Sequence, residues 1–155
     1  EHIEVPLIVA GVDRQPSAEG IVDTMGIAST LLDALDVPKH ASFLGCSAFA
    51  RGPVAVITET AGRGNADVER RDLYFTVTTA QYRMMSVLKQ AQLHVLHLFD
   101  RIADPEEAND LARREEQRAS INTLIGHLFT ERGALLAERG VDATAPPLTP
   151  PPLAS

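Results

Sequence analysis

The stretch AQLHVLHLFD, residues 91–100, decides how the second half of the chain is interpreted. Apolar residues in and around it recur at spacings of three and four rather than two. Such a recurrence is typical of one face of an α-helix. The sequence therefore predicts a helix over residues 80–102, with a broad apolar stripe that faces the core.

A second helix is predicted over residues 107–139. Asp104 followed by Pro105 is a typical helix start, because aspartate caps free N–H groups and proline fits the first helical position. Gly140 is a typical helix end. The two helices together predict a long C-terminal helical hairpin, followed by a proline-rich tail at residues 141–155, which we expect to be extended polyproline II.

The N-terminal half predicts a strand at residues 3–12 and a helix at residues 18–36. An antiparallel β-hairpin is predicted over residues 54–79, because apolar Leu73, Phe75 and Val77 alternate with polar neighbours. The predicted fold class is therefore α+β. We expect a single compact domain over residues 1–140, with the tail outside it.

Composition limits the possible partners and the compartment. The chain has 155 residues, 45% of them hydrophobic, and a net charge of −7, which disfavours general binding to nucleic acid or anionic membrane. Cys46 is the single cysteine, so neither an intrachain disulfide nor a cysteine-rich zinc site is predicted. We expect a cytoplasmic protein, or one incorporated in a particle assembled inside the cell.

Both predicted C-terminal helices have apolar or small residues outside their core stripes. On the first helix these are Met85, Leu93 and Leu96. On the second helix they form a row of small side chains: Ala119, Thr123, Gly126, Thr130, Gly133 and Ala137. The row has a mean spacing typical of paired helices. It predicts a protein interface, although a solvated face would explain the row equally well.

His94 and His97 are spaced so that both could reach one metal ion. A di-iron helical bundle, however, carries Glu-x-x-His motifs on facing helices, and this sequence has none. We therefore predict no metal and no cofactor, with the two histidines kept as weak candidates. Cys46 has no recognisable activating partner in the sequence, so no catalytic residue is predicted either.

The predicted function is that of a structural or scaffolding subunit in a homo-oligomeric or multi-component assembly, for example a virion. Its partners would be copies of itself and another subunit, bound through the helical hairpin and the proline-rich tail. The main alternative is a small-molecule enzyme or sensor, with a pocket between the sheet and the hairpin near Cys46, Tyr74 and His94. A third possibility is a regulatory module that binds through the charged segment 106–120.

Overall fold

The computed structural model describes residues 7–15, 17, 21–61, 73–89 and 92–138. The chain divides into two compact units, Glu1–Pro53 and Val54–Ser155, and each is described by itself. The expected single domain over residues 1–140 stays a prediction. The proline-rich tail expected at residues 141–155 lies outside the described residues.

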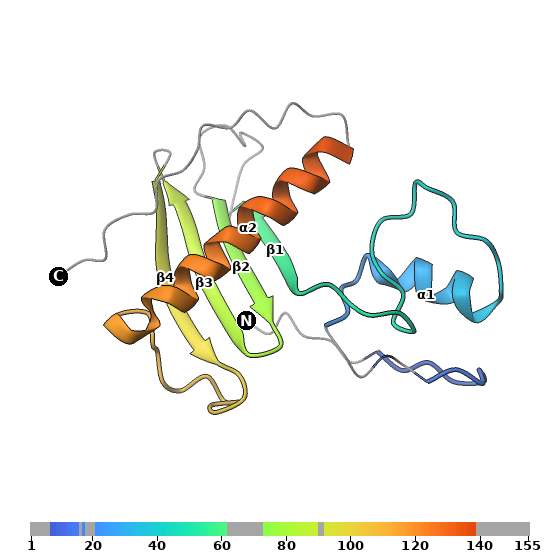
Figure 1. The fold of residues 1–155 in the computed structure, drawn as a ribbon, viewed down its shortest axis with the longest axis horizontal. Coiled ribbons are helices and arrows are strands. Elements are labelled where there is room, and N and C mark those ends of the chain that lie inside the picture. The colour runs from blue at the N-terminus through green and yellow to red at the C-terminus, as the bar shows by residue number, and fades with distance from the viewer. Residues whose placement is uncertain (1–6, 16, 18–20, 62–72, 90–91, 139–155) are drawn as a thin grey trace. The chain divides into compact units, whose positions relative to one another are not determined.

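The second unit contains a four-stranded antiparallel sheet with the strand order β1-β2-β3-β4 (Figure 1). The strands are β1 (Ala55–Ala61), β2 (Leu73–Thr79), β3 (Tyr82–Lys89) and β4 (Gln92–Asp100). A short 3-10 helix, η2 (Glu115–Gln117), leads into α2 (Arg118–Glu138), which lies across one face of the sheet. The predicted β-hairpin is confirmed, since β1 and β2 pair antiparallel with Ile57 opposite Val77.

The predicted helix over residues 80–102 is wrong, because most of these residues form the strands β3 and β4. A β-bulge explains the misleading spacing. Met85 pairs with His97 and Ser86 pairs with Val95, which leaves Leu96 as an extra residue in β4. Such a residue reverses the alternation of side chains between the two faces of a strand. The described part of the chain therefore contains no C-terminal helical hairpin.

The second helix begins later in the chain than the sequence predicts. Residues 101–114 form turns, and α2 starts only at Arg118. Asp104 does not cap a helix: its carboxylate accepts a hydrogen bond from the backbone N–H of Asn109 at 2.7 Å. Aspartate side chains favour turns because they compete with the helical hydrogen bonds of the backbone.

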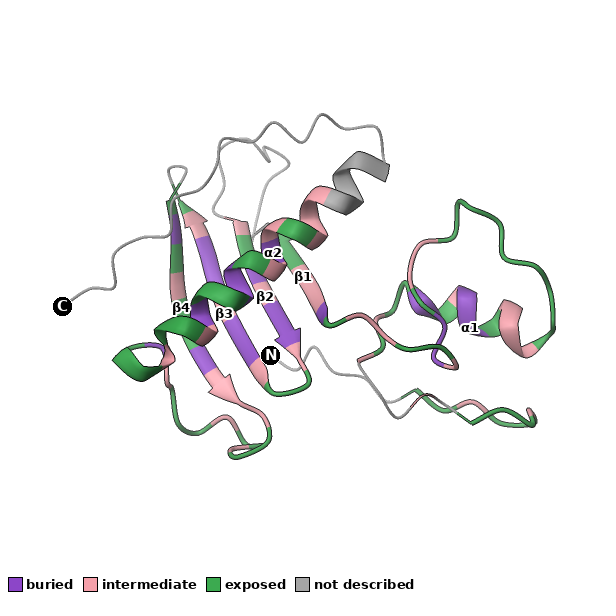
Figure 2. Ribbon diagram, in the orientation of Figure 1, coloured by how far each residue is buried: buried purple, intermediate pink, exposed green. Residues whose placement is uncertain are grey.

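The core of the second unit lies between α2 and the face of the sheet that we call the inner face. Figure 2 shows buried residues on the strands beneath α2. The fully buried apolar residues of this core include Val77, Met84, Leu93, Leu98 and Leu128. Full burial of such a side chain contributes about 1.5–3 kcal/mol, so this layer dominates the stability of the unit.

The first unit contains one helix, α1 (Gly26–Ala34), which is shorter than the predicted helix over residues 18–36. Residues 21–25 are not helical, and residues 18–20 are outside the described residues. The strand predicted at residues 3–12 is also absent over residues 7–12, where the structure describes the chain. Among the described helices, none combines the length and apolar character needed to span a membrane.

Candidate functional site

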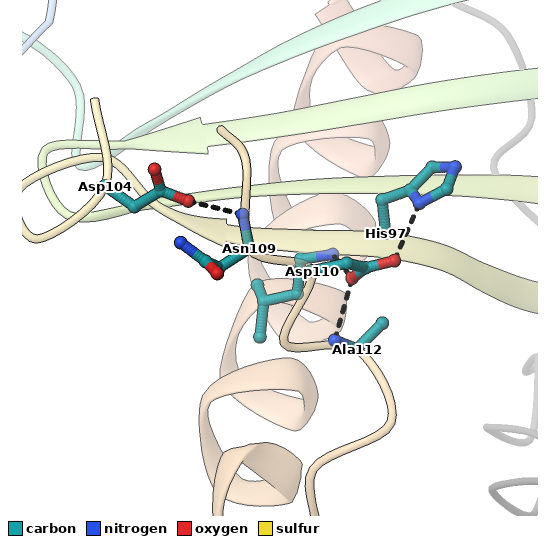
Figure 3. A network of polar contacts seen from close by, with 6 residues as sticks. His97, Asp104, Asn109, Asp110 and Ala112 are labelled. Carbon is teal, nitrogen blue, oxygen red and sulfur yellow. Dashed lines mark hydrogen bonds and ion pairs between the residues drawn. The ribbon is translucent and has the colours of Figure 1, made fainter. Parts of the chain in front are cut away.

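The most organised polar cluster of the described chain joins β4 to the turn that follows it (Figure 3). His97 lies on the outer face of the sheet, opposite the face that α2 covers, because its register partner is Met85 and the neighbouring Met84–Leu98 pair is in the core. The Nδ1 atom of His97 lies 2.8 Å from Oδ2 of Asp110. The contact fixes one edge of the imidazole.

Asp110 is itself held by the backbone. Its Oδ1 atom accepts hydrogen bonds from the N–H groups of Leu98 at 3.0 Å and Ala112 at 2.9 Å. Partial burial raises the pKa of this carboxyl, but the hydrogen bonds from Ala112, His97 and Leu98 outweigh it and lower the pKa below its ordinary value. Asp110 is therefore an ionised and well-positioned partner for the histidine.

The ring of His97 is also supported on its flat side. It stacks on Phe99 with a centroid distance of 5.9 Å and an interplanar angle of 17°. Its side chain is still 51% exposed, and Figure 3 shows the second ring nitrogen, Nε2, pointing away from Asp110. Nε2 is therefore the atom that can donate or accept a proton, or bind a polar ligand.

The turn beneath this histidine is built by two further aspartates and an ion pair. Asp100 accepts backbone hydrogen bonds from Ile102 and Ala103, and Asp104 accepts one from Asn109. The guanidinium of Arg83 on β3 forms an ion pair with Glu107, whose side chain is only 24% exposed. These contacts fix the turn against the sheet, so that His97 and Asp110 sit on a rigid support.

The predicted metal candidates do not form a ligand set here. His94 is exposed and lies opposite Val87 on the outer face. In the described ranges, no group of three His, Cys, Asp or Glu side chains is arranged to hold a metal ion. Glu115 and Glu116 form ion pairs with Arg118 and Arg114, respectively.

The predicted interface residues separate into different environments. Leu93 is buried in the core, Met85 is half-buried on the outer face of β3, and Leu96 is exposed at the bulge. They share no helical face, because they lie on strands. Of the row on α2, Ala119, Thr123, Gly126 and Thr130 are exposed and Gly133 is half-buried, while the side chain of Ala137 is not described. An interface role for this row stays a prediction.

The pocket predicted between the sheet and a helical hairpin cannot form as expected, because the described residues contain no C-terminal helical hairpin. Tyr74 and His94 do share a face, since both pair with Val87, but it is the outer face. Cys46 belongs to the first unit and is exposed. His40, its nearest histidine in sequence, contacts Ser42 through Nδ1 at 2.9 Å.

The pairing of His97 with Asp110 was not predicted from the sequence. One signal could have indicated it: three aspartates, at positions 100, 104 and 110, surround Pro105. Such a composition is typical of a structured turn. A turn at this point would have returned the chain toward the end of the preceding element and placed a carboxylate near its histidines.

The fold of this chain, but not its sequence, resembles known proteins. No protein-family model matches the sequence, and no curated protein is significantly similar to it. BT4656, solved in complex with its substrate D-glucosamine-2-N,6-O-disulfate, matches with a TM-score of 0.52 and 16% identity over 73% of this chain and 23% of its own. A candidate sulfatase from Bacteroides thetaiotaomicron VPI-5482 matches with a TM-score of 0.56 and 18% identity over 78% of this chain and 27% of its own.

At these identities the likeness shows the fold alone, and the chain spans about a quarter of the length of the structures that it matches. The predicted structural or virion subunit is overturned by these matches, because one neighbour was solved with a substrate and the other is a candidate sulfatase. The helical hairpin through which that subunit was expected to assemble is also not found among the residues that the structure describes. The chain shares its fold with part of each of these proteins.

Proposed function

We propose that this chain is part of an enzyme of the sulfatase type, which hydrolyses a sulfate ester of a sugar. The supporting observation is the fold likeness, which extends over about three quarters of the chain in both matches. The chain would supply one portion of the enzyme, since it spans only about a quarter of each matched structure. The proposal also agrees with the enzyme alternative that the sequence left open.

Within this enzyme, His97 is the side chain that we propose as a ligand contact. Asp110 holds Nδ1 at 2.8 Å and Phe99 supports the ring, while Nε2 faces away from both. Because Nδ1 donates to the Asp110 carboxylate, Nε2 accepts a hydrogen bond from a sugar hydroxyl in the neutral imidazole and donates one to a sulfate oxygen in the imidazolium. The ring is already held in place, so it loses little side-chain freedom on binding. The expected role is in binding the sugar rather than in breaking the sulfate ester.

The test measures the release of inorganic sulfate by the protein that carries this chain in its native source, together with any segments joined to it there. The substrates are glucosamine 6-O-sulfate, glucosamine N-sulfate and D-glucosamine-2-N,6-O-disulfate, with glucosamine 6-phosphate as the matched phosphate ester. We expect sulfate to be released from at least one of the sulfated sugars. No release from any of them, or release of phosphate alone, would overturn the proposed function.

A separate experiment tests the role of His97, and its control is His94, an exposed histidine on the same strand. We expect His97→Gln to raise KM for the sulfated sugar several-fold with little change in kcat, and His94→Gln to leave both unchanged. Sulfate release with the same KM in His97→Gln would keep the enzyme proposal and remove His97 from the ligand contacts.

A further inference from the structure

Glu107 has a backbone conformation that residues other than glycine rarely adopt. Its φ is 54, and among the residues that the structure describes, Asp36 is the only other non-glycine residue with a positive φ. A glutamate in this left-handed region is strained, and the strain persists only where the surrounding structure determines the conformation. Strained residues of this kind concentrate at functional sites, and Glu107 lies three positions before Asp110, the partner of His97.

An ion pair with Arg83 holds this strained residue. The guanidinium Nη1 of Arg83 donates a hydrogen bond to Oε1 of Glu107, and the two side chains are only 10% and 24% exposed. A partly buried ion pair is screened by salt much less than an exposed one. The backbone N–H of Glu107 also donates to the carbonyl of Asp104 at 3.0 Å. Glu107 is thus held against β3 by its side chain and within the turn by its backbone.

Arg83 lies beside the ring that supports His97. It is the register partner of Phe99 across β3 and β4, so the two side chains leave the sheet on the same face, with Cα atoms about 5 Å apart. Phe99 in turn stacks on the imidazole of His97, with the ring centroids 5.9 Å apart. Arg83 is 8% exposed, so its packed side chain limits the positions that the Phe99 ring can take.

Glu107 also determines where the second support of the imidazole lies, which is Asp110. Oδ2 of Asp104 accepts a hydrogen bond from the backbone N–H of Asn109 at 2.7 Å, and this bond closes a short turn (Figure 3). Glu107 lies inside the closed turn, shortly before Asp110 returns to the backbone of β4. A change of backbone conformation at Glu107 would therefore displace the carboxylate that contacts Nδ1 of His97.

We propose that Arg83 and Glu107 are the positioning pair of the ligand site at His97. Through Phe99 on one side and Asp110 on the other, the pair holds the imidazole so that Nε2 is directed toward a sugar ligand. Arg83 and Glu107 act through these two neighbours and do not contact the ligand. The inference rests on the proposed function for the identity of the ligand, whereas the orientation of the His97 ring can be measured without any ligand.

A double substitution separates this role from a purely structural one. Arg83→Met with Glu107→Gly removes both charges together, so no unpaired charge is left in a partly buried position. Glycine also relieves the left-handed backbone at position 107. The second unit should therefore keep its fold, as measured by circular dichroism and the urea midpoint, while the positioning contacts are lost. A purely structural role predicts that a variant with this fold intact binds its ligand normally.

The double variant is made in the protein that carries this chain in its native source. We expect its KM for the sulfated sugar to rise several-fold with little change in kcat, because the lost interactions concern binding. In histidine-labelled protein, we also expect the Hε1 resonance of His97, assigned by its loss in His97→Gln, to shift or broaden as the ring loses its two supports.

The matched control is Arg113→Met with Glu106→Gly, which makes the same chemical changes at exposed positions of the neighbouring segment. It should change neither KM nor the His97 resonance. Two results would overturn the proposal: an unchanged resonance in the folded double variant, or an unchanged KM where His97→Gln raises it.

A combined variant tests whether the pair acts through His97. When the double substitution is added to His97→Gln, we expect no further rise in KM, because the effects of residues that act through one another are not additive. A further several-fold rise would mean that the pair affects binding by another route, and it would overturn the proposal.

If the double variant fails to fold, Glu107→Gln takes its place. Glutamine keeps the length of the side chain and an oxygen that can accept a hydrogen bond from the guanidinium, so it weakens the pair with less disturbance. The same resonance and the same KM then decide between the two roles.

The outcome is distinct from that of the activity test. A changed His97 resonance in the double variant, without release of sulfate from any substrate, would keep the positioning pair and remove the sulfatase activity. Release of sulfate with KM and the resonance unaffected by loss of the pair would keep the activity and remove the positioning pair.

Discussion

The imidazole of His97 and the carboxylate of Asp110 lie 2.8 Å apart, although the two residues are separated by 13 positions in the chain. Asp110 also accepts two backbone hydrogen bonds, whereas the half-exposed His97 makes this one hydrogen bond and a ring contact with Phe99. We expect Asp110→Ala to lower the free energy of unfolding by about 1–3 kcal/mol and His97→Ala by less than about 1 kcal/mol. Urea unfolding at neutral pH measures both, and a larger loss in His97→Ala would contradict this order.

Acid should destabilise the second unit through two aspartates. The pKa of Asp100 is lowered by the backbone hydrogen bond from Ala103 and the side-chain bond from Gln81, and the pKa of Asp110 is lowered by its hydrogen bonds despite partial burial. A lowered pKa in the folded state means that the unfolded state binds more protons in acid. Their stabilisation is therefore complete above the unfolded pKa of about 3.9 and is lost as the pH falls through the folded values.

The measurement is the urea midpoint between neutral pH and about pH 3. The double variant Asp100→Asn with Asp110→Asn should show a shallower decline than the unaltered chain. Glu106→Gln, which changes an exposed carboxylate of the same turn, is the control and should keep the original slope. An unchanged slope in the double variant would remove these two aspartates as the cause.

The hydroxyl of Ser86 is buried without a hydrogen-bond partner among the described residues, and its residue is 1% exposed. It faces the inner side of the sheet, because its register partners Phe75 and Val95 belong to the core. We expect Ser86→Ala to leave the free energy of unfolding unchanged or to raise it by up to about 1 kcal/mol. The neighbouring Met84→Ala should cost about 2–5 kcal/mol; a comparable loss in Ser86→Ala would reveal a missing partner.

Leu93 and Leu96 provide a matched test of the bulge. Leu93 is 1% exposed and Leu96 is 40% exposed, although the sequence analysis placed both on the same side of a helix. Leu93→Ala should cost about 2–5 kcal/mol and Leu96→Ala less than about 1 kcal/mol. Equal losses in urea unfolding would mean that β4 pairs in a different register.

Two glycines should respond to alanine in opposite directions. Gly45 has φ +88, and a Cβ there would lie 2.5 Å from the carbonyl carbon of Met25, so Gly45→Ala should destabilise the first unit by at least about 1 kcal/mol. Gly126 in α2 has open space around its Cα, so Gly126→Ala should stabilise the second unit by up to about 1 kcal/mol. Hydrogen exchange of the amides of α1 and α2 reports the two units separately.

The β1–β2 hairpin could be predicted because its polarity is simple. Leu73, Phe75 and Val77 face the core, while the residues between them are polar. β3 could not be recognised in the same way, because Val87 on the outer face is 2% exposed and the strand is therefore apolar on both sides. In β4, the extra residue Leu96 interrupts the alternation of apolar and polar side chains, so that the apolar residues are spaced as in a helix.

The candidate site was harder to predict for a different reason. The residue types at His97 and Asp110 were visible, but their proximity depends on the path of residues 101–112, which has no periodic pattern. The burial of the polar residues Ser29 and Thr30 on α1 was equally hidden, because their hydrogen-bond partners Gly45 and Ala48 are distant in the sequence. Long-range hydrogen bonds of this kind leave no mark on local hydrophobic spacing.

The bulge at Leu96 also affects how folded copies of the chain can contact one another. In the described sheet, β4 is an edge strand, and a straight edge offers a continuous row of backbone groups on which another chain can stack. Here the row is interrupted by Leu96, and at Leu98 the N–H binds Asp110 while the carbonyl accepts from Leu111 at 2.8 Å. The bulge that made β4 difficult to recognise in the sequence therefore also disfavours edge-to-edge stacking of chains into fibre-like aggregates.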